Sequence, residues 1–494
     1  MIDINYASIR ELHAAYRTGS LTVKKVVLAH LARIAKVDSC EGGLKSVIEI
    51  NPDAIFTAKA LDHEWRDTGE MPPLFGIPVL VKDNINTHMM RTCAGSLSLM
   101  DNYTFEAQVV KYLTDAGAVI IGKANMTEFA NYMSRDGMPN GYSSRGGQTL
   151  CPYNHEKDAS GSSTGSAVGV AAGLSVASLG TETSGSIISP AGVNGVVGIK
   201  PTLGLVSRHG IIPISSTFDT AGPMARSVTD AAIMLSVIAN SDILDEATLA
   251  VQASRWDSKE YTTIPIETDY TKFLEGRNLR GIRIGINRDK ELIIAKDDSE
   301  KVAAFDRLCE MLKSNGAEII DNLEMEPRYA TRMTIMRCEF KACMNGYLRW
   351  ASNRGTKMRS LMDIIEFNQA NAQATLKYGQ SLLLEAENKA SGNLTEPAYI
   401  EALLERERAI DEMDSLFEKH SLDVLMGDAF VYIAPFTGFP SMTIPTGKRE
   451  SNNMPLHASW TARRLDEGKM LKVAYIVEQL LNVNLRPDEP ITSV

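Results

Sequence analysis

LFGIPVLVKDNI (residues 74–85) is an apolar run that is too short for a helix and rich in isoleucine and valine. Such a run predicts a buried strand, which here ends at Lys82. In QVVKYLTDAGAVIIGKANM (residues 108–126), a helical pattern is followed by a glycine and a second apolar run. The order helix, glycine stop and strand is typical of an α/β unit. The two stretches therefore predict an α/β fold.

Elements elsewhere in the chain fit the same class. The first ~60 residues predict helices, and Thr22 is the expected N-cap of the second one. The small residues of SAVGVAAGLSVASLG (166–180) predict a helix that packs closely against other backbone segments. Further strands are expected at NGVVGIKPT (194–202), GIRIGIN (281–287), LDVLMGD (422–428) and PSMTIPTG (440–447), and a last helix at KMLKVAYIVEQLLN (469–482).

The character of the chain changes between about 300 and 420, where it is charged and amphipathic. Apolar residues there repeat every three or four positions, as in LLEAENKA (383–390). We therefore expect a large mixed β-sheet covered by helices on both faces, with a helical insertion around 300–420. The expected single domain comprises N-terminal helices (1–65), a core (66–300), the insertion, and a C-terminal sheet and helix (421–494).

Composition and charge exclude several classes of function. The net charge of −10 argues against a general affinity for nucleic acid, which requires clustered lysine and arginine. The six cysteines are scattered without metal-ligand spacing, so we expect free thiols in a reducing compartment, no metal and no other cofactor. Because no signal peptide and no apolar run of membrane-spanning length are visible, the sequence predicts a cytoplasmic protein that does not bind membranes.

Serine and glycine are concentrated in SGSSTGS (160–166) and GTETSGSI (180–187). Such a loop can cradle phosphate, but no GK[ST] ending follows. It can bind a dinucleotide, but no G-x-G-x-x-G follows a strand here. It can also present hydroxyl and backbone N–H groups to an acyl centre, which suits a segment so rich in serine. On composition alone, a flexible turn is as good an interpretation as any of these.

Several separated motifs resemble the amidase signature family. The motifs richest in glycine and serine are SGSSTGSAV and GTETSGSI. The others, in chain order, are GIPVLVKDNI (76–85), AGS (94–96), GAVIIGKAN (117–125), NGVVGIKPT (194–202), SRHGIIPIS (207–215), DTAGPMAR (219–226) and GFPSMTIP (438–445). Motifs in the right order over nearly the whole chain are far more specific than one motif. The resemblance implies the amidase-signature fold and a hydrolase of linear carbon–nitrogen amide bonds.

The resemblance also implies a catalytic triad. Ser186 matches the nucleophile that forms the acyl-enzyme, Ser162 the bridging serine held by a cis peptide bond, and Lys82 the base. A serine hydroxyl needs a base within hydrogen-bond reach. Lysine can act as the base only when it is neutral. Burial in apolar surroundings, which the strand LFGIPVLV supplies, disfavours its charged form. The bridging serine would relay the proton to the base and back to the leaving amine, as histidine does in the better-known triad.

The backbone N–H groups of Thr183, Ser184, Gly185 and Ser186 form the expected oxyanion hole. Loss of one such donor typically costs ~10²–10³ in rate. Gly185 lets the backbone approach the substrate closely. Without the family context, Lys82 would be read as a surface lysine at a strand end, which is the commoner fate of lysine.

Other polar residues near the motifs have structural interpretations. Asp83 and Asn84 either orient the lysine loop or form a plain turn, and Ser163 belongs to the loop structure. A Ser-His-Asp hydrolase would need a G-x-S-x-G elbow, which is absent. His155 and His209, the histidines nearest to the motifs, are therefore expected to be loop or surface residues.

Ile188 stands two positions after the nucleophile. Family members that grip acidic substrates, such as the glutaminase subunit of the tRNA amidotransferase, usually have an arginine there. The isoleucine weakens the case for a carboxylate-bearing substrate such as glutamine. Other stretches look closer to the peptide-amidase branch, whose enzymes release ammonia from C-terminal peptide amides or small carboxamides. These stretches are VIEINPDA (47–54), SSRGGQT (143–149) and IIEFNQANA (364–372).

Two features depart from that branch. Ser184 replaces a commonly acidic residue, and HASWTARR (457–464) replaces a more glycine-rich stretch. Both changes concern the substrate pocket and leave the chemistry intact. The helical region at about 330–400 is expected to cover the cleft. Its Phe367 and Tyr378 are candidates for a hydrophobic pocket, although core packing is the more frequent role of such residues.

We therefore expect a stand-alone amidase, a monomer or homodimer, that converts small amides or C-terminal peptide amides to the acid and ammonia. The first alternative is the glutaminase subunit of a tRNA-dependent amidotransferase, which would require partner subunits. The second is a catalytically silent scaffold relative. The intact set of Lys82, Ser162 and Ser186 argues against that second alternative.

Overall fold

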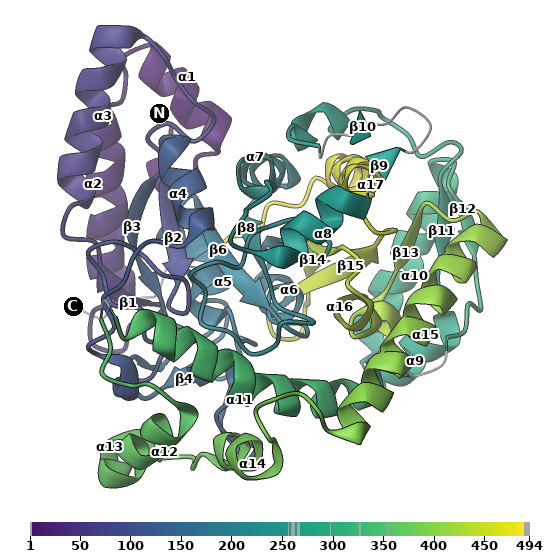
Figure 1. Cartoon of the computed structure of the whole chain (residues 1–494). Helices are drawn as coiled ribbons and strands as arrows, with labels where there is room; N and C mark the ends of the chain where they lie inside the picture. Colours follow the sequence, from purple (N-terminus) through teal and green to yellow (C-terminus); the bar gives the residue numbers. More distant parts are fainter. Residues whose placement is uncertain are drawn as a thin grey trace.

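The computed structural model describes residues 2–254, 256–257, 262–263, 267–296, 298–325, 328–353 and 355–488. An eleven-stranded sheet runs through the molecule (Figure 1). From edge to edge its strands are β1 (Val47–Ile50), β3 (Val119–Ala124), β2 (Pro78–Lys82), β6 (Ala177–Glu182), β8 (Thr220–Ala225), β7 (Val197–Lys200), β14 (Ser441–Lys448), β15 (Pro455–Thr461), β13 (Val424–Met426), β11 (Arg283–Gly285) and β12 (Glu318–Ile320). Two small ribbons pair β4 (Tyr142–Ser143) with β5 (Gly147–Gln148), and β9 (Trp256–Asp257) with β10 (Thr262–Thr263).

The sheet is mixed, as the sequence predicted. Strand β2 runs parallel to β3 and β6, and β11 runs parallel to β12 and β13. The other neighbouring pairs are antiparallel. Every residue of β2 is buried, and the strand ends at Lys82 as expected. The parallel pairing of β2 with β6 brings the end of β2 close to the serine-rich turn that follows β6.

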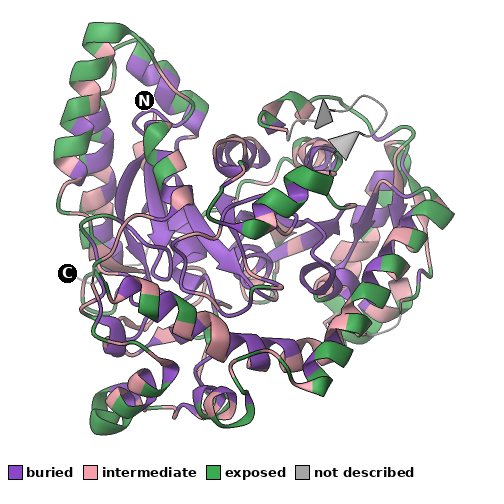
Figure 2. Cartoon of the chain, viewed as in Figure 1, coloured by how far each residue is buried: buried purple, intermediate pink, exposed green. Residues whose placement is uncertain are grey.

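Helices cover both faces of the sheet, whose central strands are buried (Figures 1 and 2). Before the insertion these are α1 (Ile9–Arg17), α2 (Val23–Arg33), α3 (Ala54–Thr68), α4 (Gln108–Asp115), α5 (Thr164–Ala171), α6 (Ile188–Val193), α7 (Val228–Ile238), α8 (Glu246–Ser254) and α9 (Arg288–Ala295). Thr22 caps α2 as predicted, because its side chain accepts a hydrogen bond from the Lys25 N–H. Among the described residues, no helix is both long enough and apolar enough to cross a membrane.

The predicted helical insertion is present. It consists of α10 (Ser299–Ser314), α11 (Arg332–Ala351), α12 (Leu361–Ala370), α13 (Ala372–Thr375), α14 (Ser381–Lys389) and α15 (Pro397–His420), interrupted by β12. The chain then ends with α16 (Ile433–Thr437) and α17 (Glu467–Leu481). Helices α11, α12, α14 and α15 contribute to a separate apolar cluster, in which Ile335 and Phe340 join Phe129 and Ile214 from connecting segments of the core. The insertion thus packs against the loops beside the serine-rich turn.

Local structure differs from the prediction in two places. Residues 47–50, within the region expected to be helical, form the edge strand β1, because Val47, Ile48 and Ile50 are β-branched and pair with β3. The stretch 166–180 is not one helix. Helix α5 ends at Ala171, and β6 begins at Ala177 after the turn at Gly173, whose φ is +69°.

Candidate active site

Lys82 is fully buried at the end of β2. Its Nζ lies 2.8 Å from Ser162 Oγ, 2.9 Å from Ser163 Oγ and 2.9 Å from Thr181 Oγ1. The carbonyl oxygen of Thr181 is a fourth neighbour at 3.1 Å. Three of the four neighbours are hydroxyls, which can donate or accept a hydrogen bond. The surroundings therefore accommodate either an ammonium or a neutral amine.

Burial lowers the pKa of Lys82 to about 7, although the negative charges of Glu182 and Asp219 act in the opposite direction. A large share of the lysine is therefore neutral near neutral pH. A neutral amine at hydrogen-bond distance from Ser162 can accept its proton. A lowered pKa is the property that a lysine needs in order to act as a base.

Ser162 lies in the loop that leads into α5. The peptide bond between Gly161 and Ser162 is cis, as the resemblance implied. Ser162 and Ser163 are fully buried, and the Ser162 carbonyl accepts a hydrogen bond from the Thr127 N–H (3.1 Å). A Cβ on Gly161 would lie 2.5 Å from Thr127 Oγ1, so only glycine fits this approach of the two loops.

Ser186 lies in the turn between β6 and α6 and is 8% exposed. Its backbone carbonyl accepts a hydrogen bond from the Ser163 N–H (3.2 Å), which joins this turn to the loop that carries Ser162. Among the described residues, the Ser186 hydroxyl has no hydrogen-bond partner, Ser162 included. The structure thus brings Lys82 and Ser162 into direct contact and places the backbone of Ser186 next to them, with its hydroxyl free.

The backbone donors of the same turn are also free. Within the described chain, the N–H groups of Thr183, Ser184, Gly185 and Ser186 donate to no acceptor. Gly185 has a φ of +84°, a conformation that side chains other than that of glycine rarely allow. Unused backbone donors in one turn suit the stabilisation of a developing oxyanion.

Comparisons with known proteins agree with this geometry. A family model described as Amidase matches residues 25–438, most of the chain. The chain belongs to the amidase family. A solved peptide amidase from Stenotrophomonas maltophilia is 38% identical to it, with a TM-score of 0.89 over 98% of this chain and 99% of that one. A probable amidase from Arabidopsis thaliana is 35% identical over 98% of this chain and 92% of its own length.

The amidase is thus a hydrolase with the mixed α/β fold that the sequence predicted. A third relative is the A subunit of the glutamyl-tRNA(Gln) amidotransferase from Carboxydothermus hydrogenoformans. It is 29% identical over 97% of this chain and 98% of its own length. The family thus includes both amidases and subunits of amidotransferases.

Glu182, which the sequence did not indicate as a site residue, stabilises the turn that carries Ser186. Its Oε2 accepts hydrogen bonds from the N–H groups of Ile187 (2.7 Å) and Ile188 (3.1 Å), directly after Ser186. Its Oε1 is buried and has no partner among the described residues. Because its charge also raises the pKa of Lys82, Glu182 influences both the turn and the lysine.

Replacing Glu182 with glutamine is expected to shift the pH dependence of the amidase. The amide oxygen can still accept from both N–H groups, so the change removes mainly the charge. In the wild type, kcat/KM should rise with pH through a midpoint near the Lys82 pKa of about 7, because only the deprotonated amine accepts a proton. Without the Glu182 charge the pKa of Lys82 falls further, so the midpoint moves to lower pH.

Glu467→Gln is the matched control for this measurement. Glu467 is fully buried and accepts a hydrogen bond from the Thr202 N–H (2.7 Å). Its charge acts on the pKa of Lys200 but is not among the charges that act on Lys82. Its replacement should leave the midpoint of the kcat/KM profile unchanged. A Glu182→Gln midpoint at the wild-type pH would contradict the coupling to Lys82.

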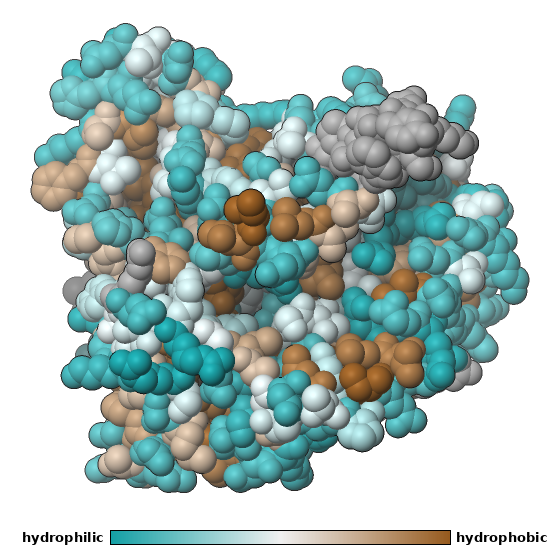
Figure 3. All heavy atoms as spheres, in the orientation of Figure 1, coloured by the Kyte–Doolittle hydropathy of each residue, from teal (hydrophilic) through white to brown (hydrophobic). Residues whose placement is uncertain are grey.

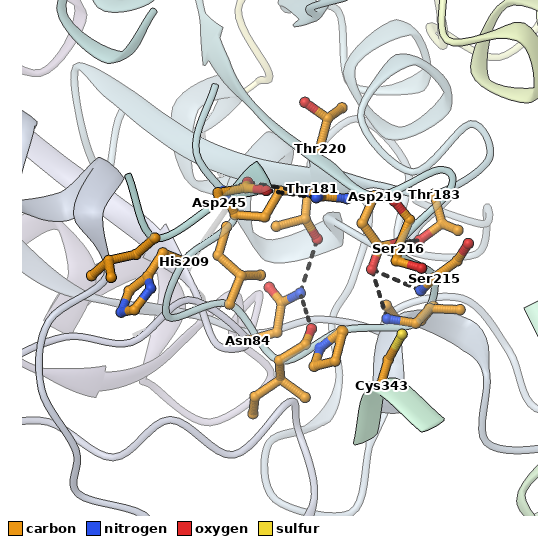
Figure 4. A pocket seen from close by; sticks show the side chains of 17 residues that line it. Asn84, Thr181, Thr183, His209, Ser215, Ser216, Asp219, Thr220, Asp245 and Cys343 are labelled. Atoms are coloured by element: carbon orange, nitrogen blue, oxygen red, sulfur yellow. Dashed lines mark hydrogen bonds and ion pairs between the residues drawn. The ribbon is translucent and has the colours of Figure 1, made fainter. Parts of the chain in front are cut away.

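A cavity of about 190 Å³ lies beside the turn (Figure 4). Asn84, Thr181 and Thr183 form its wall on the Lys82 side. The rest of the lining is mixed: Ala130, Ile211, Ile212, Pro213, Ile214, Leu244 and Cys343 are apolar, and Arg208, His209, Ser215, Ser216, Asp219, Thr220 and Asp245 are polar or charged. Leu244 is 60% exposed, and apolar side chains gather near the middle of the face that carries α8 (Figure 3). The cavity therefore offers an apolar surface next to the free backbone donors.

Asp219 fixes the polar side of this cavity. It accepts hydrogen bonds from Thr183 Oγ1 (2.6 Å) and from the N–H groups of Ile214 (2.7 Å) and Ser215 (2.9 Å). The Asp219 carboxylate thus links the turn after β6 to the loop that contains Ile214 and Ser215. The motif that begins at Asp219 (219–226) was visible in the sequence, but the hydrogen-bond partners of Asp219 were not.

The remaining residues of the sequence analysis fall in several places. Asn84 donates to Thr181 Oγ1 (3.0 Å), next to Lys82, whereas Asp83 pairs with Arg145 (2.7 Å). His155 is exposed as expected, and His209 lies in a loop of the cavity wall. Phe367 and Tyr378 do not line this cavity; Cys343 is the residue that the insertion contributes. Tyr378 packs instead on Tyr142, with ring centroids 4.8 Å apart.

Proposed function

We propose that the chain hydrolyses carboxamides, including C-terminal peptide amides, to the acid and ammonia through an acyl-enzyme on Ser186. In this proposal Ser162 relays the proton and Lys82 is the base. The main support is the 2.8 Å contact between Lys82 Nζ and Ser162 Oγ in a site where burial lowers the pKa of the lysine to about 7. The free hydroxyl of Ser186 and the free donors of its turn are consistent with it.

The steps follow from these groups. Ser186 Oγ attacks the amide carbon while its proton passes to Ser162, whose own proton passes to Lys82. The N–H groups from Thr183 to Ser186 stabilise the oxyanion. The proton returns from Lys82 through Ser162 to the nitrogen, the C–N bond breaks and ammonia leaves. Water then attacks the acyl-enzyme with the same proton relay and releases the acid and Ser186.

The apolar residues of the cavity, among them Ile211, Ile212 and Leu244, support a substrate whose acyl part carries an apolar side chain. The cavity adjoins Thr183, the first of the proposed oxyanion donors, so a group next to the scissile carbonyl can reach it. The similarity to a peptide amidase favours peptide amides within this class. Leucinamide derivatives are therefore suitable first substrates.

The alternative function is that of the glutaminase subunit of an amidotransferase, which the similarity to such subunits keeps open. Ile188 is 2% exposed and supplies no charge two residues after Ser186, which favours a stand-alone amidase over a glutaminase. We further propose that the chain acts without partner subunits, as a monomer or homodimer.

The test is ammonia release by the purified chain alone. It should hydrolyse N-acetyl-leucinamide with a metal chelator present or absent, and should act on free glutamine far more slowly. Activity on glutamine that appears only after addition of partner subunits would support the amidotransferase alternative. No turnover of any amide by a folded chain that also fails to react with a fluorophosphonate would support a silent relative.

A further inference from the structure

Arg332, the first residue of α11, lies over two tyrosine rings. Its Cζ is 5.6 Å from the ring centroid of Tyr329 and 5.4 Å from that of Tyr432. Nη1 donates a hydrogen bond to the Tyr329 carbonyl (3.1 Å). Aromatic rings that stack on a guanidinium fix the orientation of its plane. The N–H donors at the edge of that plane stay available to a ligand. The arginine is therefore oriented by the two tyrosines and by the backbone.

This arginine cluster (Tyr329, Arg332 and Tyr432) lies next to the turn that carries Ser186. Tyr432 precedes α16 and is 46% exposed. Its Cε1 lies 3.8 Å from the position that a Cβ on Gly185 would occupy. One tyrosine ring thus separates the guanidinium from the turn with the free backbone donors. A substrate held at Ser186 and extending past Tyr432 would meet Arg332.

Among the described residues, no acidic side chain forms an ion pair with Arg332. Within the same part of the chain Lys290, 5.9 Å from the Tyr329 ring centroid, forms none either. Arginines nearby are paired: Arg328 contacts Glu405 at 2.9 Å, and Arg337 contacts Glu385 at 3.4 Å. In a chain with a net charge of −10, two unpaired cations at one place favour an anionic ligand there.

We propose that Arg332 binds a carboxylate on the acyl part of the substrate, remote from the scissile amide. The inference rests on the proposed function and narrows its substrates to amides with an anionic acyl part. Ile188 supplies no charge two residues after Ser186, and the carboxylate is expected several bonds further out, where Arg332 lies. An arginine fork is suited to carboxylate geometry, and Lys290 adds a weaker attraction.

The test compares two amides that differ only at the far end of the acyl group, N-succinyl-leucinamide and N-butyryl-leucinamide. The wild type should favour the succinyl compound by about 10-fold in kcat/KM, the size expected for a charge-assisted hydrogen bond. Arg332→Gln should abolish the preference, so that the ratio of kcat/KM for the two compounds falls to about one. Lys290→Gln should reduce the preference by less, and added salt should weaken it.

Arg349→Gln is the matched control, because Arg349 is an exposed arginine on the same helix. It should retain the full preference. Equal kcat/KM for the two compounds in the wild type would overturn the inference. A preference that survives in Arg332→Gln would do the same. Turnover of the neutral compound by the wild type supports the proposed amide hydrolysis whichever way the ratio falls, so the two proposals fail separately.

Discussion

Replacing Ser186 with alanine is expected to lower kcat for amide hydrolysis by about 10⁴- to 10⁶-fold, since the proposed acyl-enzyme forms on its hydroxyl. The Ser186 hydroxyl has no protein partner among the described residues, so its removal leaves no buried group unsatisfied. The variant should unfold at the wild-type temperature. Ammonia release measures the rate, and thermal unfolding shows that the loss is chemical.

Ser189→Ala is the matched control, because Ser189 follows three residues later and its N–H donates to the Gly185 carbonyl (2.8 Å). That backbone bond remains when the side chain is shortened. Activity should stay within about threefold of the wild type, as for most substitutions outside the reacting groups. Retained activity in Ser186→Ala would assign the nucleophile to another residue.

Replacing Lys82 with methionine is expected to lower kcat by about 10²- to 10⁴-fold, the range for loss of a general base. Methionine fills most of the buried space but accepts no proton. Two of the hydroxyls around Nζ keep other contacts: Ser163 Oγ donates to the Thr181 carbonyl (3.0 Å) and Thr181 Oγ1 accepts from Asn84 (3.0 Å). Ser162 Oγ loses the one side-chain partner that it has among the described residues. The loss should persist across the pH range, because the titrating group itself is gone.

Lys123→Met is the control for burial. Lys123 is also fully buried, on β3 opposite Val81, and its pKa is likewise lowered, to about 8. Its Nζ contacts Thr92 Oγ1 (3.0 Å) and the Ile85 carbonyl, not the serines. It should lose stability comparable to Lys82→Met while the folded fraction keeps its activity. Similar activity losses in both variants would indicate that Lys82 supports only the fold.

Much of the fold could be predicted from the sequence because its signals are local. The apolar run before Lys82 forms β2, and Gly117 lies between the end of α4 and the start of β3. The strands β8 and β15 were not predicted, because their pattern depends on pairing with strands that are distant in sequence. The same dependence on tertiary contacts hid β1 at the sheet edge.

For the candidate site, the sequence motifs indicated the residues of the proposed triad but not the residues around them. Lys82, Ser162 and the turn at Ser186 come together because parallel strands β2 and β6 end at the same edge of the sheet. The roles of Glu182 and Arg332 could not be predicted from the sequence. A carboxylate that bonds to the backbone of a turn and an arginine on a distant helix have no local sequence pattern. The cavity wall also differed, because the loop around Ile212 forms it rather than Phe367.

The most direct measurement is the rate at which a fluorophosphonate labels the chain as a function of pH, with the labelled residue identified by peptide mass spectrometry. Proton transfer to a neutral Lys82 by way of Ser162 predicts a label on Ser186 and a rate that rises with pH through about 7. In Lys82→Met that rise should disappear. A label on a different serine, or the same pH dependence in Lys82→Met, would contradict the proposed proton transfer.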